Sequence, residues 1–164
     1  LRVIREAPCP VITIKGKKHR TGCKNIVLPL DLTKETKEKV SKAIEIAGLF
    51  GSTINLVSVL TTDDEFIVNK LKRQMNQVHE FVVEHNIPCT IEFLHGSEVS
   101  EEIVSYSKKI KADLLMIMTQ EELTWTDIMF IDSSAQSIIN ESEIPVLSIR
   151  PKEKKDTTAS VFQY

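Results

Sequence analysis

Features that would point to particular classes of function are scarce in this sequence. The 164 residues carry 21 Lys and Arg against 23 Asp and Glu, so no excess of charge favours binding to nucleic acid or to an anionic membrane. No apolar run reaches the ~18 residues that a membrane-spanning helix needs. The cysteines number three and are scattered, which indicates free thiols in a reducing compartment. We therefore expect a cytoplasmic protein with no nucleic-acid or membrane partner.

Motifs for catalysis and metal binding are also missing. No histidine lies in a local motif that pairs it with a nucleophile. His79 and Glu80 do not form an HExxH zinc motif because Val83 stands where the second histidine would be. His19 and Cys23 are too few ligands for a closed zinc site. We predict no catalytic residue and no metal site, and we assign no enzymatic activity.

A repeat links the two ends of the chain. Residues 2–15 (RVIREAPCPVITIK) and residues 137–150 (SIINESEIPVLSIR) match at a constant offset of 135. That offset is about one domain length and far exceeds the roughly 20–50 residues of a solenoid period. The repeat predicts that residues 1–15 are the last helix and strand of a preceding domain. A linker (16–24), a second domain (25–151) and a polar tail (152–164) would follow.

Apolar runs of strand length alternate with helical patterns through the second domain. The expected strands are 25–31, 53–60, 87–93, 114–118 and 145–150. The first expected helix has one apolar face, made of Val40, Ala43, Ile44, Ala47 and Phe50. The third expected helix begins at Gly96 and Ser97, and the last covers residues 133–142. Such alternation predicts an α/β fold, a three-layer doubly wound arrangement with a mainly parallel five-stranded sheet.

Ligands of such sheets bind outside the carboxyl ends of the strands. This rule places a candidate crevice near Pro29–Asp31 and Met118–Gln120. A response-regulator receiver has a similar layout. It is disfavoured because the third strand ends in Leu94, His95 and Gly96, without a phosphoacceptor aspartate.

Four stretches within residues 25–151 resemble a universal stress protein domain. They are NIVLPLD, GSEVSEEIVSYSKKIKADLLMIM, DSSAQSIINES and IPVLSIRP. The resemblance implies an adenine-nucleotide alpha-hydrolase-like fold with strand order 3-2-1-4-5. The leading RVIREAPCPVITIKG is similar to the close of a domain of the same family, in which tandem domains are common.

Nucleotide-binding members of that family carry Gly-x-x-Gly, nine residues, then Gly before Ser or Thr. Here the first two glycine positions hold Met118 and Glu121, and the third falls at Asp132, one residue later than the strict spacing and just before Ser133. Glycines let the backbone approach phosphates, whereas the carboxylates of Glu121, Glu122, Asp127 and Asp132 would repel them. We therefore expect no cofactor and disfavour ATP or AMP.

The resemblance also points to a degenerate nucleotide site. Asp31 matches the family's acidic residue after the first strand, and Ser133 and Ser134 match the Ser or Thr after the lost glycine. With Met118 they form the candidate cofactor-binding set. The alternative for Asp31 is capping of the following helix or ordering of the turn that leads to it. The alternative for both serines is capping of the last helix.

Members of the family pair the edges of their last strands antiparallel across a two-fold or pseudo-two-fold axis. We predict this pairing for Pro10–Lys15 and Pro145–Arg150, within one chain or between chains, in a homodimer or pseudo-dimer. The predicted interface residues are Pro10, Val11, Ile12, Ile14, Pro145, Val146, Leu147 and Ile149.

Two functions follow from the resemblance. In the first, the chain is a regulatory module of the stress response without a working ATP loop, and it acts through dimerisation or protein association. In the second, it is a sensor that holds a nucleoside or other small molecule near Asp31 and Met118.

Overall fold

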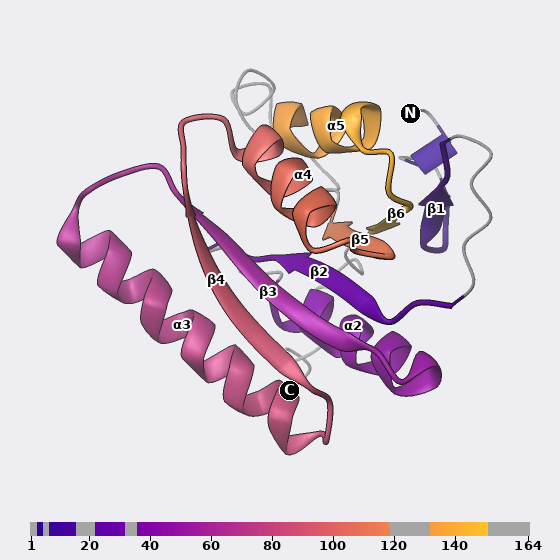
Figure 1. The fold of residues 1–164 in the computed structure, drawn as a ribbon, viewed down its shortest axis with the longest axis horizontal. Coiled ribbons are helices and arrows are strands. Elements are labelled where there is room, and N and C mark those ends of the chain that lie inside the picture. The colour runs from indigo at the N-terminus through magenta and orange to yellow at the C-terminus, as the bar shows by residue number, and fades with distance from the viewer. Residues whose placement is uncertain (1–2, 5–6, 16–21, 32–35, 119–131, 151–164) are drawn as a thin grey trace, which may run out of the picture.

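The structure is a computed structural model that describes residues 3–4, 7–15, 22–31, 36–118 and 132–150 (Figure 1). Strands and helices alternate along the chain, as the apolar pattern predicts. In chain order they are β1 (Val11–Thr13), β2 (Asn25–Pro29), α2 (Thr36–Phe50), β3 (Thr53–Leu60), α3 (Glu65–Glu84), β4 (Cys89–His95), α4 (Val99–Lys109), β5 (Leu114–Met118), α5 (Asp132–Glu141) and β6 (Val146–Ile149). None of the described helices is both long and apolar enough to cross a membrane.

The sheet has six strands in the order β1-β6-β5-β2-β3-β4. The five strands from β2 to β6 are parallel and keep the predicted order 3-2-1-4-5, with β2 at the centre. These are the five predicted strands, and β1 adds a sixth at the outer edge of β6. An edge strand exposes a row of unpaired backbone groups, and β1 satisfies those of β6.

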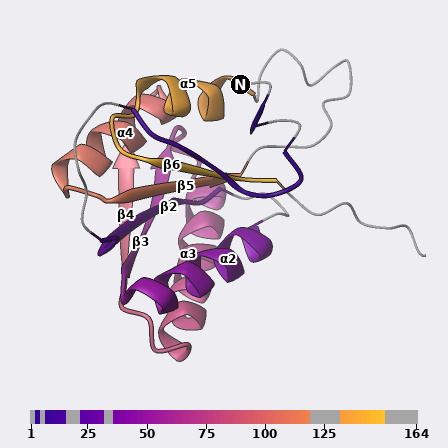
Figure 2. The same ribbon diagram turned by 90° about the vertical axis from the view of Figure 1, so that its right-hand side faces the viewer.

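Helices cover both faces of the sheet, which makes the three predicted layers (Figures 1 and 2). The helices α2 and α3 lie on one face, and α4 and α5 lie on the other. The core on the α2 side is built around Ile26, Leu28, Leu56 and Met116. The core on the α4 and α5 side contains Val27, Val57, Leu115 and Ile117, among others. Neighbouring residues of β2, β3 and β5 therefore point to opposite faces and are buried on both, as expected for central parallel strands.

The end of α2 differs from the sequence expectation. Val40, Ala43 and Ala47 are buried as predicted, but Phe50 is 60% exposed. Gly51 follows with a left-handed φ of 63°, and the Ser52 N–H donates to the Ala47 oxygen, so the chain reverses there to enter β3. Phe50 stands at this reversal and points away from the core.

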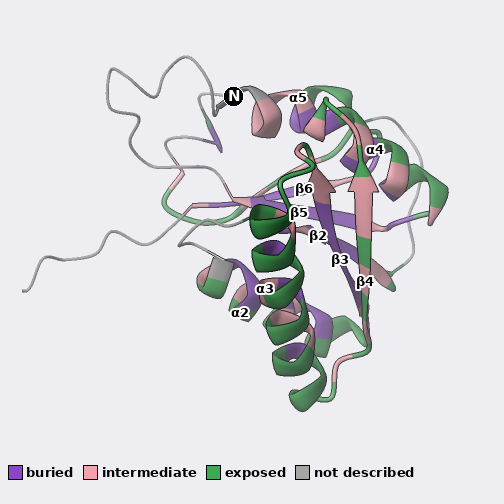
Figure 3. Ribbon diagram, turned by 90° about the vertical axis from the view of Figure 1, so that its left-hand side faces the viewer, coloured by how far each residue is buried: buried purple, intermediate pink, exposed green. Residues whose placement is uncertain are grey.

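The helix α3 lies against β3 and β4 and buries only a narrow stripe, Leu71, Met75 and Val82 (Figure 3). The Asp64 carboxylate caps its start by accepting from the N–H groups of Phe66 and Ile67. The third predicted helix, α4, begins at Val99 rather than at Gly96.

Candidate functional site

A cavity of about 430 Å³ opens at the carboxyl ends of the central strands. The strands β2, β3 and β5 contribute their last residues and those just after them, including Asp31, Leu60 and Met118. The first two turns of all four helices supply the remaining walls, with Lys39 from α2 and Ser134 from α5 among them. The cavity lies where the sequence places the crevice, and its volume is within the ~300–1,000 Å³ typical of small-molecule sites.

The end of β2 is fixed by three hydrogen bonds at the floor of this cavity. The Leu30 N–H donates to the Val57 oxygen at 2.8 Å, which continues the β2–β3 pairing past Pro29. The Ser58 hydroxyl donates to the Leu30 oxygen at 2.9 Å. The Lys39 ammonium donates to the Pro29 oxygen at 2.9 Å. Backbone carbonyls that end a buried strand are thus satisfied, and the segment leading to Asp31 is held in place.

Two charged side chains line the cavity among the residues that the structure describes. Asp31 is exposed, whereas Lys39 is only 7% exposed. The other lining residues are apolar or carry a hydroxyl group, for example Val57, Ile117 and Thr62. The site is therefore an apolar hollow with one buried positive charge and one solvent-exposed negative charge.

The structure brings together three of the four candidate site residues. Asp31, Met118 and Ser134 all line the cavity, although they come from three separate parts of the chain. Ser133 lies in the first turn of α5, and its side chain falls outside the described residues. Glu121, Glu122 and Asp127 also fall outside them, as does the side chain of Asp132. The predictions about those carboxylates stay predictions.

Two residues at the site, Lys39 and Ser58, are not among those predicted from the sequence. Lys39 lies in a helix whose other lysines are exposed or half-buried, and its pattern gives no sign of burial. Ser58 is a polar residue in an apolar strand, TINLVSVL, where a buried hydroxyl must find a partner. That interruption is the one available signal.

The outer edge of the sheet is the second predicted feature. Val11, Ile12 and Thr13 of β1 pair antiparallel with Ser148, Leu147 and Val146 of β6, which confirms the predicted pairing within one chain. Val146, Leu147 and Ile149 are buried and Val11 is half-buried, whereas Ile12 and Ile14 are 54% and 70% exposed. Pro10 is exposed, and Pro145 is half-buried.

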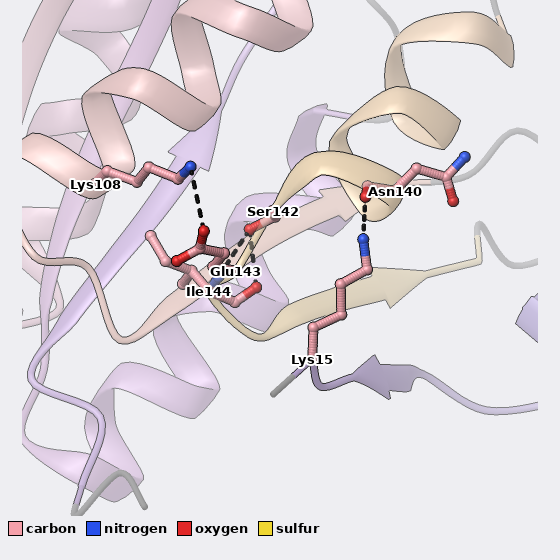
Figure 4. Close-up of polar contacts among 6 residues, drawn as sticks. All are labelled: Lys15, Lys108, Asn140, Ser142, Glu143 and Ile144. Carbon is pink, nitrogen blue, oxygen red and sulfur yellow. Dashed lines mark hydrogen bonds and ion pairs between the residues drawn. The ribbon is translucent and has the colours of Figure 1, made fainter. Parts of the chain in front are cut away.

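Polar contacts around the end of α5 hold this edge together (Figure 4). The Lys15 ammonium donates to the main-chain oxygen of Asn140. The Thr13 hydroxyl also donates to the Val146 oxygen, at 3.3 Å. Ser142 shapes the turn between α5 and β6, because its hydroxyl both donates to the Ile144 oxygen and accepts from the Ile144 N–H. The strand β1 is thus tied both to β6 and to α5.

The described residues offer no cluster of three or more His, Cys, Asp or Glu that could hold a metal ion. The three cysteines are free thiols. Burial raises the pKa of the Cys89 thiol from 9.0 to about 11, and burial also raises that of Cys23. Raised values oppose thiolate formation, so neither cysteine has the electropositive setting of a reactive nucleophile.

A known protein family matches most of the chain. The family model of the universal stress protein family matches residues 22–150. No curated protein in the comparison matches the sequence.

Several solved structures share the fold. A universal stress protein from Archaeoglobus fulgidus in complex with dAMP has 20% identity and a TM-score of 0.62, over 77% of this chain and 97% of that one. A universal stress protein in complex with cAMP has 14% identity and a TM-score of 0.66, over 79% and 98%. Another universal stress protein, from Archaeoglobus fulgidus DSM 4304, has 16% identity and a TM-score of 0.69, over 90% of this chain and 52% of that one.

Proposed function

The chain belongs to the universal stress protein family, and from that premise we propose that it is a regulatory module that binds a small molecule in its crevice without an ATP-binding glycine loop. One observation carries the proposal: Asp31, Met118 and Ser134 converge on a single cavity of about 430 Å³ at the carboxyl ends of the strands. The complexes of structural neighbours with dAMP and cAMP support a ligand of about nucleotide size.

The residues at the loop positions support the exclusion of ATP. Met118 puts a side chain where the first glycine would let the backbone approach a phosphate. Glu121 occupies the second position and Asp132 lies one residue past the strict third position, and carboxylates there would repel a triphosphate. Binding in the crevice would thus rely on its apolar walls and on the groups near Asp31.

Isothermal titration of the full chain with adenosine, AMP and ATP with magnesium tests this proposal. We expect a nucleoside-sized ligand to bind and ATP to bind no more tightly than AMP. Met118→Ala should not create tight ATP binding, because the carboxylates of Glu121 and Asp132 remain. If ATP bound at micromolar concentration, and more tightly than AMP and adenosine, the exclusion would be wrong. Mass spectrometry of molecules released on denaturation gives an independent view of any ligand carried through purification.

A second function is association through the edge that carries β1. It is favoured by Ile12 and Ile14, two large apolar side chains that are more than half exposed at that edge. We propose that this edge forms the dimer or pseudo-dimer contact of the module. Sedimentation at rising concentration should show association that Ile12→Asp and Ile14→Asp weaken. The matched control is Val83→Asp on α3, which is 47% exposed beside the opposite sheet edge. If the protein stayed a monomer at all concentrations, the proposed association through this edge would be wrong.

A further inference from the structure

We propose that the ligand of the crevice is an uncharged, largely apolar small molecule, held by aliphatic walls and oriented by neutral hydrogen bonds. The inference rests on the proposed small-molecule function and specifies the chemical class of the ligand. The structural neighbours in complex with dAMP and cAMP hold charged ligands, so this crevice would differ from theirs in the chemistry that it accepts.

Aliphatic side chains make up most of the described wall of the crevice. The strands contribute Val57, Val59 and Ile117, and the helices contribute others, such as Val99 and Ile138. Such walls favour a ligand in proportion to the apolar surface that it removes from water. The volume of about 430 Å³ has room for a small molecule that meets these walls with apolar groups of its own.

The charged groups of the described wall are engaged within the protein. Lys39 is 7% exposed, and its ammonium donates to the Pro29 oxygen at 2.9 Å. Asp31 also interacts with other protein groups, and Lys39 has a further interaction besides this hydrogen bond. An ionic ligand would compete with such partners and would lose its hydration on entering the apolar hollow. One positive and one negative side chain also leave the described wall without a formal net charge.

Acidic residues offset the positive ends of the surrounding helices. The first two turns of α2, α3, α4 and α5 contribute to the wall, and a helix N-terminus by itself attracts an anion. However, Glu38 lies in the first turn of α2 and Glu65 in that of α3, where the Asp64 carboxylate also caps the helix. Glu101 and Glu102 lie in the first turn of α4. The helix ends therefore give an anion little advantage in this crevice.

The hydroxyl groups of the wall suit a neutral ligand. Those of Ser58 and Thr62 already hydrogen-bond to main-chain groups of the protein. Thr61 and Ser134 add two more hydroxyls to the wall. A hydroxyl can donate or accept, so these two can orient an amide, carbonyl or hydroxyl group of a ligand. Such groups need no counter-ion in the wall.

The test compares two fluorescent probes that share one ring framework, each titrated into the full chain. N-phenyl-1-naphthylamine is uncharged, whereas 8-anilinonaphthalene-1-sulfonate carries one negative charge on the same framework. We expect the uncharged probe to bind at least about tenfold more tightly, because an anion that leaves water without a matched cation is strongly disfavoured. Adenosine and AMP form a second pair, in which adenosine should bind more tightly.

Two matched variants locate the binding in the crevice. Ala135 of α5 is half-buried and lines the crevice, so Ala135→Phe should fill part of the hollow and weaken binding of the uncharged probe at least about tenfold. Ser105 of α4 is exposed and lies outside the described wall. Ser105→Phe adds the same ring there and should leave the affinity unchanged. Circular dichroism checks that both variants fold.

The wild-type affinity ratio decides even if Ala135→Phe does not fold. If the anionic member of either pair bound as tightly as its neutral partner, or more tightly, the inference would be wrong and the small-molecule function would stand. If Ala135→Phe folded and left binding of the uncharged probe unchanged, that probe would bind elsewhere, and the inference would again be wrong. Failure of all four ligands to bind would reject the inference together with the proposed function.

Discussion

Lys15, just after β1, donates a hydrogen bond from its ammonium to the main-chain oxygen of Asn140 in the last turn of α5. The last turn of α5 contains no basic residue of its own. The carbonyl groups at a helix C-terminus lack partners within the helix, and a cation near them is favourable. The residue that follows the strand paired with β6 therefore caps the helix that precedes β6.

Replacing Lys15 should weaken this cap. We expect Lys15→Met to lower the free energy of unfolding by about 0.5 kcal/mol, since the contact is exposed and screened by water. Urea denaturation followed by circular dichroism measures the change. Lys72→Met, on the exposed side of α3, is the control and should have a smaller effect. Equal effects of the two changes would argue against the cap.

Removing the hydroxyl of Ser148 should stabilise the protein. Its oxygen is the one buried side-chain polar atom without a hydrogen-bond partner in the part of the chain that the structure describes. Desolvating such a group costs about 1–3 kcal/mol, so Ser148→Ala should raise the free energy of unfolding by about 1 kcal/mol. Ser142 is equally buried, but its hydroxyl makes two hydrogen bonds. Ser142→Ala should therefore destabilise, and chemical denaturation of the pair distinguishes the two cases.

The two aspartates before α3 should differ in their contribution to stability. Asp64 accepts hydrogen bonds from two N–H groups of the first turn, at 2.8 and 3.3 Å. Loss of such a cap typically costs about 1 kcal/mol, and we expect this loss for Asp64→Ala. Asp63→Ala should change little, because the cap is the carboxylate of Asp64. Thermal melts of the two variants, side by side, test the assignment, and a larger loss for Asp63→Ala would contradict it.

The cysteines should react at very different rates. Burial raises the pKa of Cys89 to about 11, whereas Cys9 is exposed. At pH 8 the raised pKa makes the thiolate fraction of Cys89 much smaller than that of a thiol with the ordinary value of 9.0, so a disulfide reagent should label the exposed Cys9 first and Cys89 last. The raised pKa also has a consequence for stability. The half-buried neutral thiol of Cys89 stabilises the fold fully below pH 9.0, and this contribution is lost as the pH rises through about 11. Mass spectrometry of partially labelled protein gives the order, and early labelling of Cys89 would refute the prediction.

The sequence is most informative where residues act through a regular pattern. Continuous apolar runs identify β3 and β5 to the residue, and the parallel arrangement that they predict brings the end of β2 and the end of β5 to one edge of the sheet. Asp31, Met118 and Ser134 do meet at that edge. Parallel topology makes such a prediction possible because the carboxyl ends of all the strands lie on one side.

Other features depend on packing that no local pattern encodes. Whether Lys39 is buried depends on how the first turn of α2 lies against the end of β2, and helical periodicity assigns such a lysine to solvent. Phe50 fits the apolar stripe of α2, but the chain reversal at Gly51 removes it from the core. Both cases concern helix ends, where periodicity stops being a guide to burial.

The attachment of β1 also constrains the order of folding. Thr13 and Val146 are 133 positions apart, and closing a loop of that length in an unfolded chain costs about 4 kcal/mol of entropy. The pairing of only three residues of β1 with β6 offsets little of that entropic cost. Once β2 to β6 have assembled, the loop to be closed shrinks to the short connection between β1 and β2. We therefore expect β1 to dock last during folding and to exchange its amide hydrogens before the central strands do.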